Sequence, residues 1–243
     1  MTTEATKNDI IVTGVREVDE KMGGGIPVGS LALIEGQSDA GKSVLCQHLA
    51  YGTLGISQSS VAYYTTENTV RSLISQMDSL SLGTLDYFLT DRFRIYPLTL
   101  GSRLQTKKNV DTEKPLRFLA ENFAQQPEQF KLLIMDSITL LVAHSNPIAI
   151  MDFFWACKYL CDQGRSIVLV AHSYAFEEEM LSRTRSLCDA HFRLKLEQVG
   201  DRLVKIMEVL KVSGAERPTG EVVSFDIEPR MGMRIIPLAK AKV

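Results

Sequence analysis

Long apolar runs are missing from this chain of 243 residues. Its first residues are polar, so no signal peptide is expected, and no stretch approaches the roughly 20 apolar residues that a helix needs to cross a bilayer. We therefore expect any contact with a membrane to be made through a partner. A surplus of one charge is missing too. The 27 Lys and Arg and 29 Asp and Glu residues give a formal net charge of −2, which offers no general attraction to nucleic acid or anionic lipid.

Cysteine is scarce, with only four residues: Cys46, Cys157, Cys161 and Cys188. Cys157 and Cys161 stand four apart on an expected helix and so share one face. A metal site built on this pair would need further Cys or His ligands at zinc-site spacing, and the sequence offers none. We expect reduced cysteines buried in the core, which favours a cytosolic, reducing compartment.

Two common catalytic motifs are also missing. The sequence has no G-x-S-x-G elbow with a Ser-His-Asp order, which argues against a serine hydrolase. It has no G-x-G-x-x-G fingerprint either, because Gly23-Gly24-Gly25 leads into a turn rather than a helix. His48, His144 and His191 have no catalytic or metal-binding group of residues around them, and we interpret them as structural.

What the sequence does contain is a phosphate-binding loop of the form G-x-x-x-x-G-K-S. Its residues are Gly36, Gln37, Ser38, Asp39, Ala40, Gly41, Lys42 and Ser43. An apolar run precedes the loop and a helical pattern beginning at Val44 follows it. Glycine lets the backbone N–H groups close around phosphates, and the helix N-terminus adds its positive dipole end. A chance match in a glycine-rich turn is the alternative, and the strand–loop–helix context argues against it.

Three residues have expected roles in holding ATP and Mg²⁺. We predict that ATP binds at residues 36–44, that Lys42 reaches its β- and γ-phosphates, and that the Ser43 hydroxyl ligates Mg²⁺. A second carboxylate, usually acting through water, is expected at the end of an apolar strand. Asp136 follows the apolar run 132–135 and fits this role, while the alternative is that it caps a helix.

Two further polar residues end expected strands. Glu67 follows the run 60–64, which lies beside the P-loop strand if the strand order is ordinary. There Glu67 would polarise the attacking water, and the alternative is a solvated glutamate stabilised by a helix dipole. His172 ends the run 166–171, where a polar side chain that senses the γ-phosphate commonly sits. A strand-end histidine without that role is the alternative.

Strands and helices alternate up to about residue 190. Apolar runs that read as strands stand at residues 31–34, 60–64, 93–98, 131–136 and 166–171. Helical patterns stand at residues 15–22, 70–80, 116–124, 147–160 and 177–188. This alternation predicts an α/β fold with a central, mostly parallel β-sheet.

The pattern changes from Ala190 onward. Alternating or β-branched runs stand at residues 191–196, 203–212 and 222–227. They predict that the sheet finishes in antiparallel C-terminal strands. We expect a single ATP-binding domain over residues 10–243, after a flexible N-terminus at residues 1–9. Residues 26–30 read as a turn, and residues 101–115 as a long exposed loop.

The glycine-rich approach to the P-loop resembles a known family. Residues 23–30, read as GGGIPVGS and followed by LALIEG, are similar to the KaiC-like branch of the RecA superfamily. Within that branch, residues 225–238 resemble the ending of the FlaH family, also called ArlH, of the archaeal flagellum or archaellum. The resemblance covers nearly the whole chain. It implies a RecA/KaiC-like P-loop core that binds ATP with Mg²⁺.

The same resemblance implies partners and a place in the cell. FlaH-type proteins form a homo-hexameric ring that stacks on the motor ATPase FlaI and meets other archaellum base components. The implied location is cytoplasmic, at the membrane-associated base of the motor, without direct membrane insertion. The implied role is an ATP-binding regulatory or assembly subunit whose nucleotide state controls ring formation.

This chain departs from the KaiC pattern at two positions. KaiC-like proteins end their second strand in a Thr-x-Glu-Glu element, whereas here Glu67 is followed by Asn68. A Lys-x-Arg pair reaches the γ-phosphate of the neighbouring subunit in KaiC, and here Lys211 matches the lysine while Ser213 replaces the arginine. Lys211 is therefore a candidate contact in trans. Both departures predict that ATP hydrolysis is absent or slow.

Two other functions remain open at this point. A RecA-like, DNA-acting ATPase would need basic side chains in the loops after the strands that end at Asp136 and His172. Residues 140–146 contain no Lys or Arg, and residues 173–180 carry three consecutive glutamates, so nucleic acid is disfavoured. A KaiC-like signalling autokinase is not excluded, because serine and threonine are plentiful.

Overall fold

The computed structural model describes residues 10–56, 59–98, 114–199, 202–215 and 220–236. Six strands run parallel: β3 (Leu31–Gly36), β4 (Ser60–Thr65), β5 (Phe93–Pro97), β6 (Phe130–Asp136), β7 (Ser166–His172) and β8 (Ala190–Val199). Three antiparallel strands complete the sheet: β9 (Arg202–Val212), β10 (Val222–Glu228) and β11 (Gly232–Ile235). The nine strands follow the order β11-β10-β9-β8-β3-β7-β6-β4-β5.

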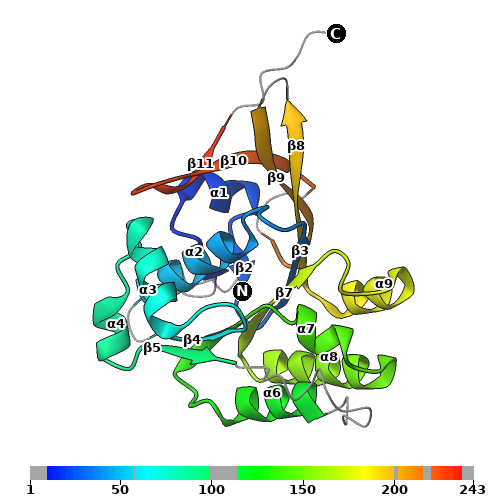
Figure 1. Cartoon of the computed structure of the whole chain (residues 1–243). Helices are drawn as coiled ribbons and strands as arrows, with labels where there is room; N and C mark the ends of the chain where they lie inside the picture. Colours follow the sequence, from blue (N-terminus) through cyan, green and yellow to red (C-terminus); the bar gives the residue numbers. More distant parts are fainter. Residues whose placement is uncertain (1–9, 57–58, 99–113, 200–201, 216–219, 237–243) are drawn as a thin grey trace, which may run out of the picture.

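Helices cover both faces of this sheet (Figure 1). One face carries α1 (Arg16–Lys21), α2 (Lys42–Leu54), α3 (Val70–Ser79) and α4 (Leu85–Leu89). The other face carries α6 (Lys114–Gln125), α7 (Thr139–Ala143), α8 (Pro147–Asp162) and α9 (Glu178–Leu187). Every residue of β3 and β4 is buried. Their continuous apolar runs, without alternation, are what a parallel strand needs when it is covered on both faces.

The structure confirms the mostly parallel sheet with antiparallel C-terminal strands, and it corrects details. β8 pairs in parallel with β3, so the antiparallel part begins only at β9. The expected turn at residues 26–30 contains β2 (Ile26–Pro27), which pairs with β1 (Ile10–Ile11) in a separate two-stranded sheet. The expected loop at residues 101–115 lies largely outside the described residues, and its last two residues already belong to α6.

One prediction about neighbouring strands is wrong. β4, which leads to Glu67, does not lie beside the P-loop strand β3, because β7 and β6 stand between them. The strand that ends at Asp136 is likewise separated from β3 by β7. A parallel sheet still brings these strand ends to one edge, so loops from non-adjacent strands can meet there.

The C-terminal strands curl back over α2 (Figure 1). The backbone N–H of Met233 in β11 donates to Nε2 of His48 in α2 at 3.0 Å. Burial lowers the pKa of His48, which fits a neutral imidazole that accepts this hydrogen bond. His48 therefore has a structural role, as interpreted from the sequence, because it joins α2 to β11. Helix α2 is held between the parallel sheet and the last two strands.

Gly52 provides a test of how tightly α2 is packed. Helix propensity alone favours alanine at an interior helical glycine by roughly 1 kcal/mol. The structure predicts the opposite, because a Cβ at Gly52 would lie 2.0 Å from the carbonyl oxygen of Val12. We expect Gly52→Ala to lower the free energy of unfolding in urea by about 1–3 kcal/mol, the usual cost of overpacking. Gly83→Ala is the matched control, since nothing lies within 4 Å of its Cβ position, and equal stability of both variants would contradict the packing.

Candidate nucleotide-binding site

The P-loop follows β3 and is fixed to the neighbouring strand β8. Gln37 N–H donates to the Leu194 carbonyl at 3.1 Å, and the Gln37 side-chain oxygen accepts from Leu196 N–H at 2.8 Å. The approach is so close that a Cβ on Gly36 would lie 1.9 Å from the Leu194 carbonyl oxygen. Gly41, at the start of α2, has φ +94°, a conformation that side chains rarely adopt. Both glycines of the motif are therefore required by the backbone.

A buried carboxylate stabilises the strand just before the loop. Glu35 Oε1 lies 2.6 Å from Nη2 of Arg185 and 2.9 Å from Nε of Arg193, and 3.2 Å from Nε2 of His191. Burial alone would raise the pKa of Glu35, but these contacts outweigh burial and lower it to about 2. His191 thus has a structural partner, and α9 and β8 are tied to the strand that carries the P-loop.

Lys42 is buried and folds back onto the loop. Its Nζ donates to the carbonyls of Gly36 at 3.2 Å and Gln37 at 2.5 Å, and it lies 3.4 Å from Nδ1 of His172. Burial lowers the pKa of Lys42, while nearby Asp136 and Glu67 act in the opposite direction. An ammonium group in this position can transfer its hydrogen bonds from the carbonyls to phosphate oxygens without moving far.

His172 lies between the P-loop lysine and the surface. Burial, and next the charge of Lys42, lower the pKa of His172. The neutral ring can then accept through Nδ1 and carry its proton on Nε2. The ring also stacks on Tyr174, with 5.2 Å between centroids and 16° between planes. This geometry places a hydrogen-bonding group next to Lys42, as a γ-phosphate sensor requires, and the sensing role stays a prediction.

Asp136 ends β6 and points into the same space. Its Oδ2 accepts from the Tyr63 hydroxyl at 2.8 Å. Burial raises the pKa of Asp136, and hydrogen bonds from Tyr63 and Ser43 oppose that rise. The alternative role as a helix cap is not supported, because the N-cap of α7 is Ile138 and has no side-chain cap bond. A buried carboxylate in contact with Ser43 fits a Mg²⁺ ion, which favours one or two carboxylates, a hydroxyl and phosphate oxygens.

Glu67 reaches the site from β4 although two strands separate β4 from β3. Its backbone N–H donates to the Thr65 hydroxyl at 3.3 Å, which fixes the turn after the strand. The next residue faces elsewhere: the Asn68 side-chain oxygen accepts from the Ser72 hydroxyl at 3.1 Å and from Gln76 Nε2 at 2.9 Å. Asn68 therefore secures the loop to α3, and Glu67 is the carboxylate that this loop offers to the site.

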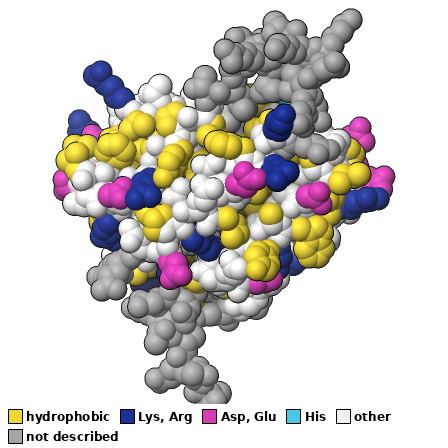
Figure 2. Space-filling model, turned by 90° about the horizontal axis from the view of Figure 1, so that it is seen from below, with side chains coloured by type: hydrophobic (Ala, Val, Ile, Leu, Met, Phe, Trp, Pro, Cys, Tyr) yellow, Lys and Arg dark blue, Asp and Glu magenta, His cyan; other side chains and the backbone are white. Residues whose placement is uncertain are grey.

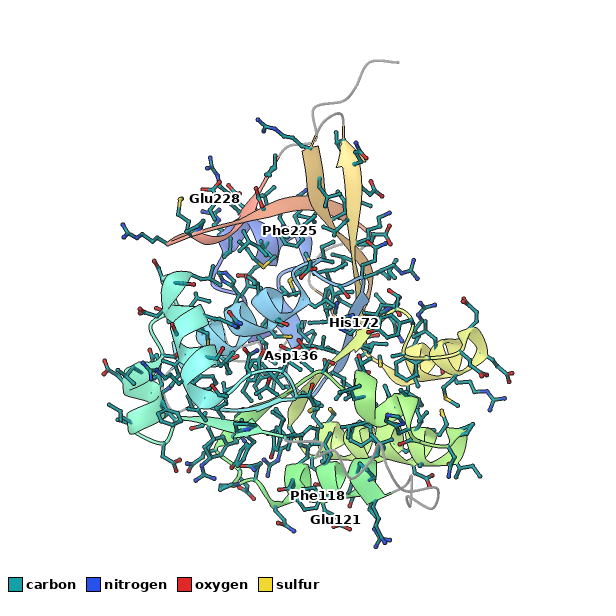
Figure 3. All side chains as sticks on the ribbon, in the orientation of Figure 1. Phe118, Glu121, Asp136, His172, Phe225 and Glu228 are labelled. Carbon is teal, nitrogen blue, oxygen red and sulfur yellow. The ribbon has the colours of Figure 1, made fainter. Side chains whose placement is uncertain are left out.

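These residues surround one cavity of about 400 Å³. Its lining contains Ser38, Asp39, Gly41, Lys42, Ser43, Val44, Glu67, Asp136, Ser137, Val170, His172 and Ile227. Figure 3 shows Asp136 and His172 near the centre of the molecule, where the strand ends meet. Sequence reasoning missed the last contributor, Ile227. It comes from β10, and no local motif marks a residue that reaches the site only because the C-terminal strands curl back.

Lys211 lies outside this cavity. Its Nζ donates to the Cys188 carbonyl at 2.7 Å, within the same chain. The predicted contact with a neighbouring subunit's γ-phosphate would require the ammonium group to leave that carbonyl.

The four cysteines, including Cys188, are buried and form no disulfide bond. The described residues contain no group of three or more His, Cys, Asp or Glu side chains arranged to hold a metal.

Comparison with known proteins now adds to this geometry. A protein-family model described as "ATPase: KaiC" matches residues 11–240. The archaeal flagellar ATP-binding protein FlaH of Sulfolobus acidocaldarius is 30% identical over 236 residues, which cover 96% of this chain and 99% of the relative. This chain belongs to the FlaH family of KaiC-type ATPases. Nucleotide binding is therefore the activity that its family implies.

Two further matches agree with FlaH membership. The FlaH protein of Methanocaldococcus jannaschii is 30% identical over 223 residues, which cover 90% of this chain and 91% of the relative. The crystal structure of flagellar accessory protein FlaH from the same organism matches with a TM-score of 0.81 and 28% identity, covering 94% of this chain and 99% of that one. The resemblance to KaiC-like and FlaH proteins, and the RecA/KaiC-like fold, are confirmed. Among the described residues, no helix is long and apolar enough to cross a membrane.

Asp136→Asn tests the metal role, because it keeps the shape of the side chain and removes its charge. We expect Mg²⁺ affinity in the presence of ATP to fall about 10–100-fold, the usual loss when a residue that supports a metal through other ligands is changed. ATP binding in EDTA is expected to stay nearly unchanged. Because burial raises the pKa of Asp136, protons compete with Mg²⁺, so Mg²⁺ affinity falls as pH is lowered towards that raised pKa. Calorimetric titration measures the Mg²⁺ affinity in the presence of ATP and the ATP affinity in EDTA. An equal loss of ATP affinity with and without Mg²⁺ would contradict the prediction.

Proposed function

We propose that residues 10–243 act as one ATP-binding domain and that this FlaH-family chain is a regulatory or assembly subunit of the archaellum motor. In this proposal Mg²⁺ and ATP bind at the P-loop and promote a homo-hexameric ring. The ring docks on the motor ATPase FlaI and other base components in the cytoplasm, at the membrane-associated base. The observation that carries the proposal is a pocket lined by the P-loop, Glu67 and Asp136, in which Lys42 is the one Lys or Arg among the described lining residues.

The single cation supports binding without fast turnover. Phosphoryl transfer is accelerated about 10³–10⁵-fold by an arginine that stabilises the developing charge, and no arginine is among the described residues that line this pocket. Ser213, which replaces the KaiC arginine, is exposed and follows β9. Lys211 lacks the planar fork of a guanidinium. Glu67 remains as a base that can orient water, so slow hydrolysis is expected rather than none.

The rival role on DNA finds little support in the charges of this fold. Residues 140–146 include most of α7 and contain no Lys or Arg. The loop after β7 leads into α9 through Glu177, Glu178 and Glu179, all exposed. Contacts with a phosphate backbone require basic side chains, and these two segments present none at the expected positions.

Ring formation tests the proposed role directly. We expect light scattering to show the 27.1 kDa chain converting to a six-fold assembly when Mg²⁺ and ATP are added. Lys42→Ala removes a charge-assisted phosphate contact of roughly 2–3 kcal/mol, so it should weaken ATP binding about 30–150-fold and block the conversion at matched ATP. Unaltered ATP affinity in Lys42→Ala would disprove the P-loop assignment. An assembly state that is the same with and without Mg²⁺ and ATP would disprove the regulatory role.

Steady-state turnover is the second test. We expect ATP hydrolysis by the purified ring, with Mg²⁺ and without any partner, to be far below the typical enzyme value of about 10 s⁻¹. Ser213→Arg is expected to raise hydrolysis if this position faces the neighbouring γ-phosphate, and Ser213→Lys is the matched control because it adds charge without the fork. Turnover near the typical value in the parent chain would favour a motor over a regulatory subunit.

A further inference from the structure

Helix α8 presents large apolar side chains to solvent. Its inner face is buried against the sheet, as expected from its apolar sequence. Its outer face carries Ile148, Trp155 and Tyr159, whose side chains are 72%, 56% and 65% exposed. Their spacing of seven and four residues puts them on one side of the helix. Phe118 of the neighbouring helix α6 is 61% exposed. Figure 2 views the molecule from this side and shows hydrophobic side chains spread across it.

A shallow groove lies between α6 and α8. It has a volume of about 230 Å³ and is lined by Arg117, Ala120, Ala149, Asp152, Phe153 and Ala156. Three of these are alanines, so the walls are low and the backbones of both helices can be approached closely. An amphipathic helix can lay its apolar face into an apolar groove between helices, and Trp and Tyr are enriched at the energetic hot spots of interfaces.

One carboxylate in the groove has no ion-pair partner among the described residues, whereas two nearby basic side chains are paired. Arg117 is paired with Glu121 at 3.0 Å, and Lys158 of α8 is paired with Asp189 at 2.8 Å. Asp152, exposed in the groove, has no ion-pair partner among the described residues. At its first turn α8 borders a second hollow, of about 450 Å³, whose lining includes Glu177. An unpaired carboxylate in the groove repels the phosphates of nucleic acid and anionic lipid and favours a partner with Lys or Arg.

We propose that this α6–α8 face, formed by Phe118, Ile148, Asp152, Trp155 and Tyr159, docks a protein partner through an amphipathic helix. The apolar side of that helix packs on Trp155 and Tyr159, and a lysine or arginine meets Asp152. No residue of the face lines the nucleotide cavity, and Figure 3 shows Phe118 and Glu121 at the outer edge of the molecule, away from Asp136 and His172. The inference therefore goes beyond nucleotide-dependent assembly and assigns a separate protein-binding surface.

Trp155 is the only tryptophan of the chain and reports directly on the face. The probes are two synthetic helical peptides, one of Leu and Lys and one of Leu and Glu, added to the full-length chain. We expect the Leu/Lys peptide to shift Trp155 emission to shorter wavelength and to reduce quenching by acrylamide, and the Leu/Glu peptide to do neither. Asp152→Lys is expected to reverse the order of the two peptides.

Variants of the face and a control variant elsewhere distinguish specific docking from nonspecific hydrophobic binding. Ile148→Ala combined with Tyr159→Ala is expected to weaken the Leu/Lys peptide at least about tenfold, because hot-spot truncations commonly cost that much. Leu203→Ala is the matched control, since Leu203 is also 65% exposed but lies on β9, and it should leave the affinity unchanged. Lys42→Ala should bind the Leu/Lys peptide with the affinity of the parent chain. Loss of ATP binding can therefore be distinguished from loss of peptide binding.

Several results would contradict the proposal that this face docks an amphipathic helix. Equal binding of both peptides, or equal affinity in the double variant and the Leu203→Ala control, would remove the chemical basis of the proposal. A shift of Trp155 emission that grows with protein concentration alone would mean that a second copy covers the face. Full protection from acrylamide in the isolated chain would mean that the chain covers it itself. A larger shift with phosphatidylglycerol vesicles than with the Leu/Lys peptide would assign the face to membrane instead.

Discussion

The close contact between the start of the P-loop and β8 is the constraint on which the site depends. Gly36 has no space for a side chain against the Leu194 carbonyl, and Gln37 bonds to β8 through both its backbone and its side chain. The loop is therefore fixed before any ligand arrives, so that its N–H groups need little reorganisation to receive phosphate. Glu35, held by Arg185 of α9 and Arg193 of β8, adds a second anchor to β8 just before the loop.

Parts of this arrangement follow from the sequence and parts do not. The P-loop and the carboxylate after a buried strand were predictable, because Gly36, Lys42 and Asp136 each sit in a local pattern that few other structures share. The neighbours of β3 were not, since buried strands all read alike and their order depends on which helices pack between them. For the same reason β8 was assigned to the antiparallel part, and Ile227 was missed, because only the curl of the last strands brings it to the pocket.

Substitution at Asn68 shows how structure changes the meaning of a sequence departure. Read from the family pattern, the residue is a lost glutamate. In the structure its side-chain oxygen accepts bonds from Ser72 and Gln76 and holds the loop that carries Glu67. Asparagine at this position therefore removes a second carboxylate and adds hydrogen bonds that hold the loop to α3. The loss of that carboxylate supports the proposal of slow hydrolysis, because rapid chemistry depends on interactions that strengthen in the transition state.

The proposed docking face and the nucleotide pocket lie on different sides of one packed core. Apolar residues of β6 and β7, whose last residues are Asp136 and His172, pack with the inner face of α8. A shared core does not by itself couple the two sites, since coupling requires an element with two discrete arrangements whose equilibrium both sites bias. If coupling exists, it must be reciprocal: ATP would change the affinity for a partner by the same factor as the partner changes the affinity for ATP. The slow hydrolysis proposed above would then matter, because only a nucleotide that stays bound can hold the partner-binding state long enough for assembly.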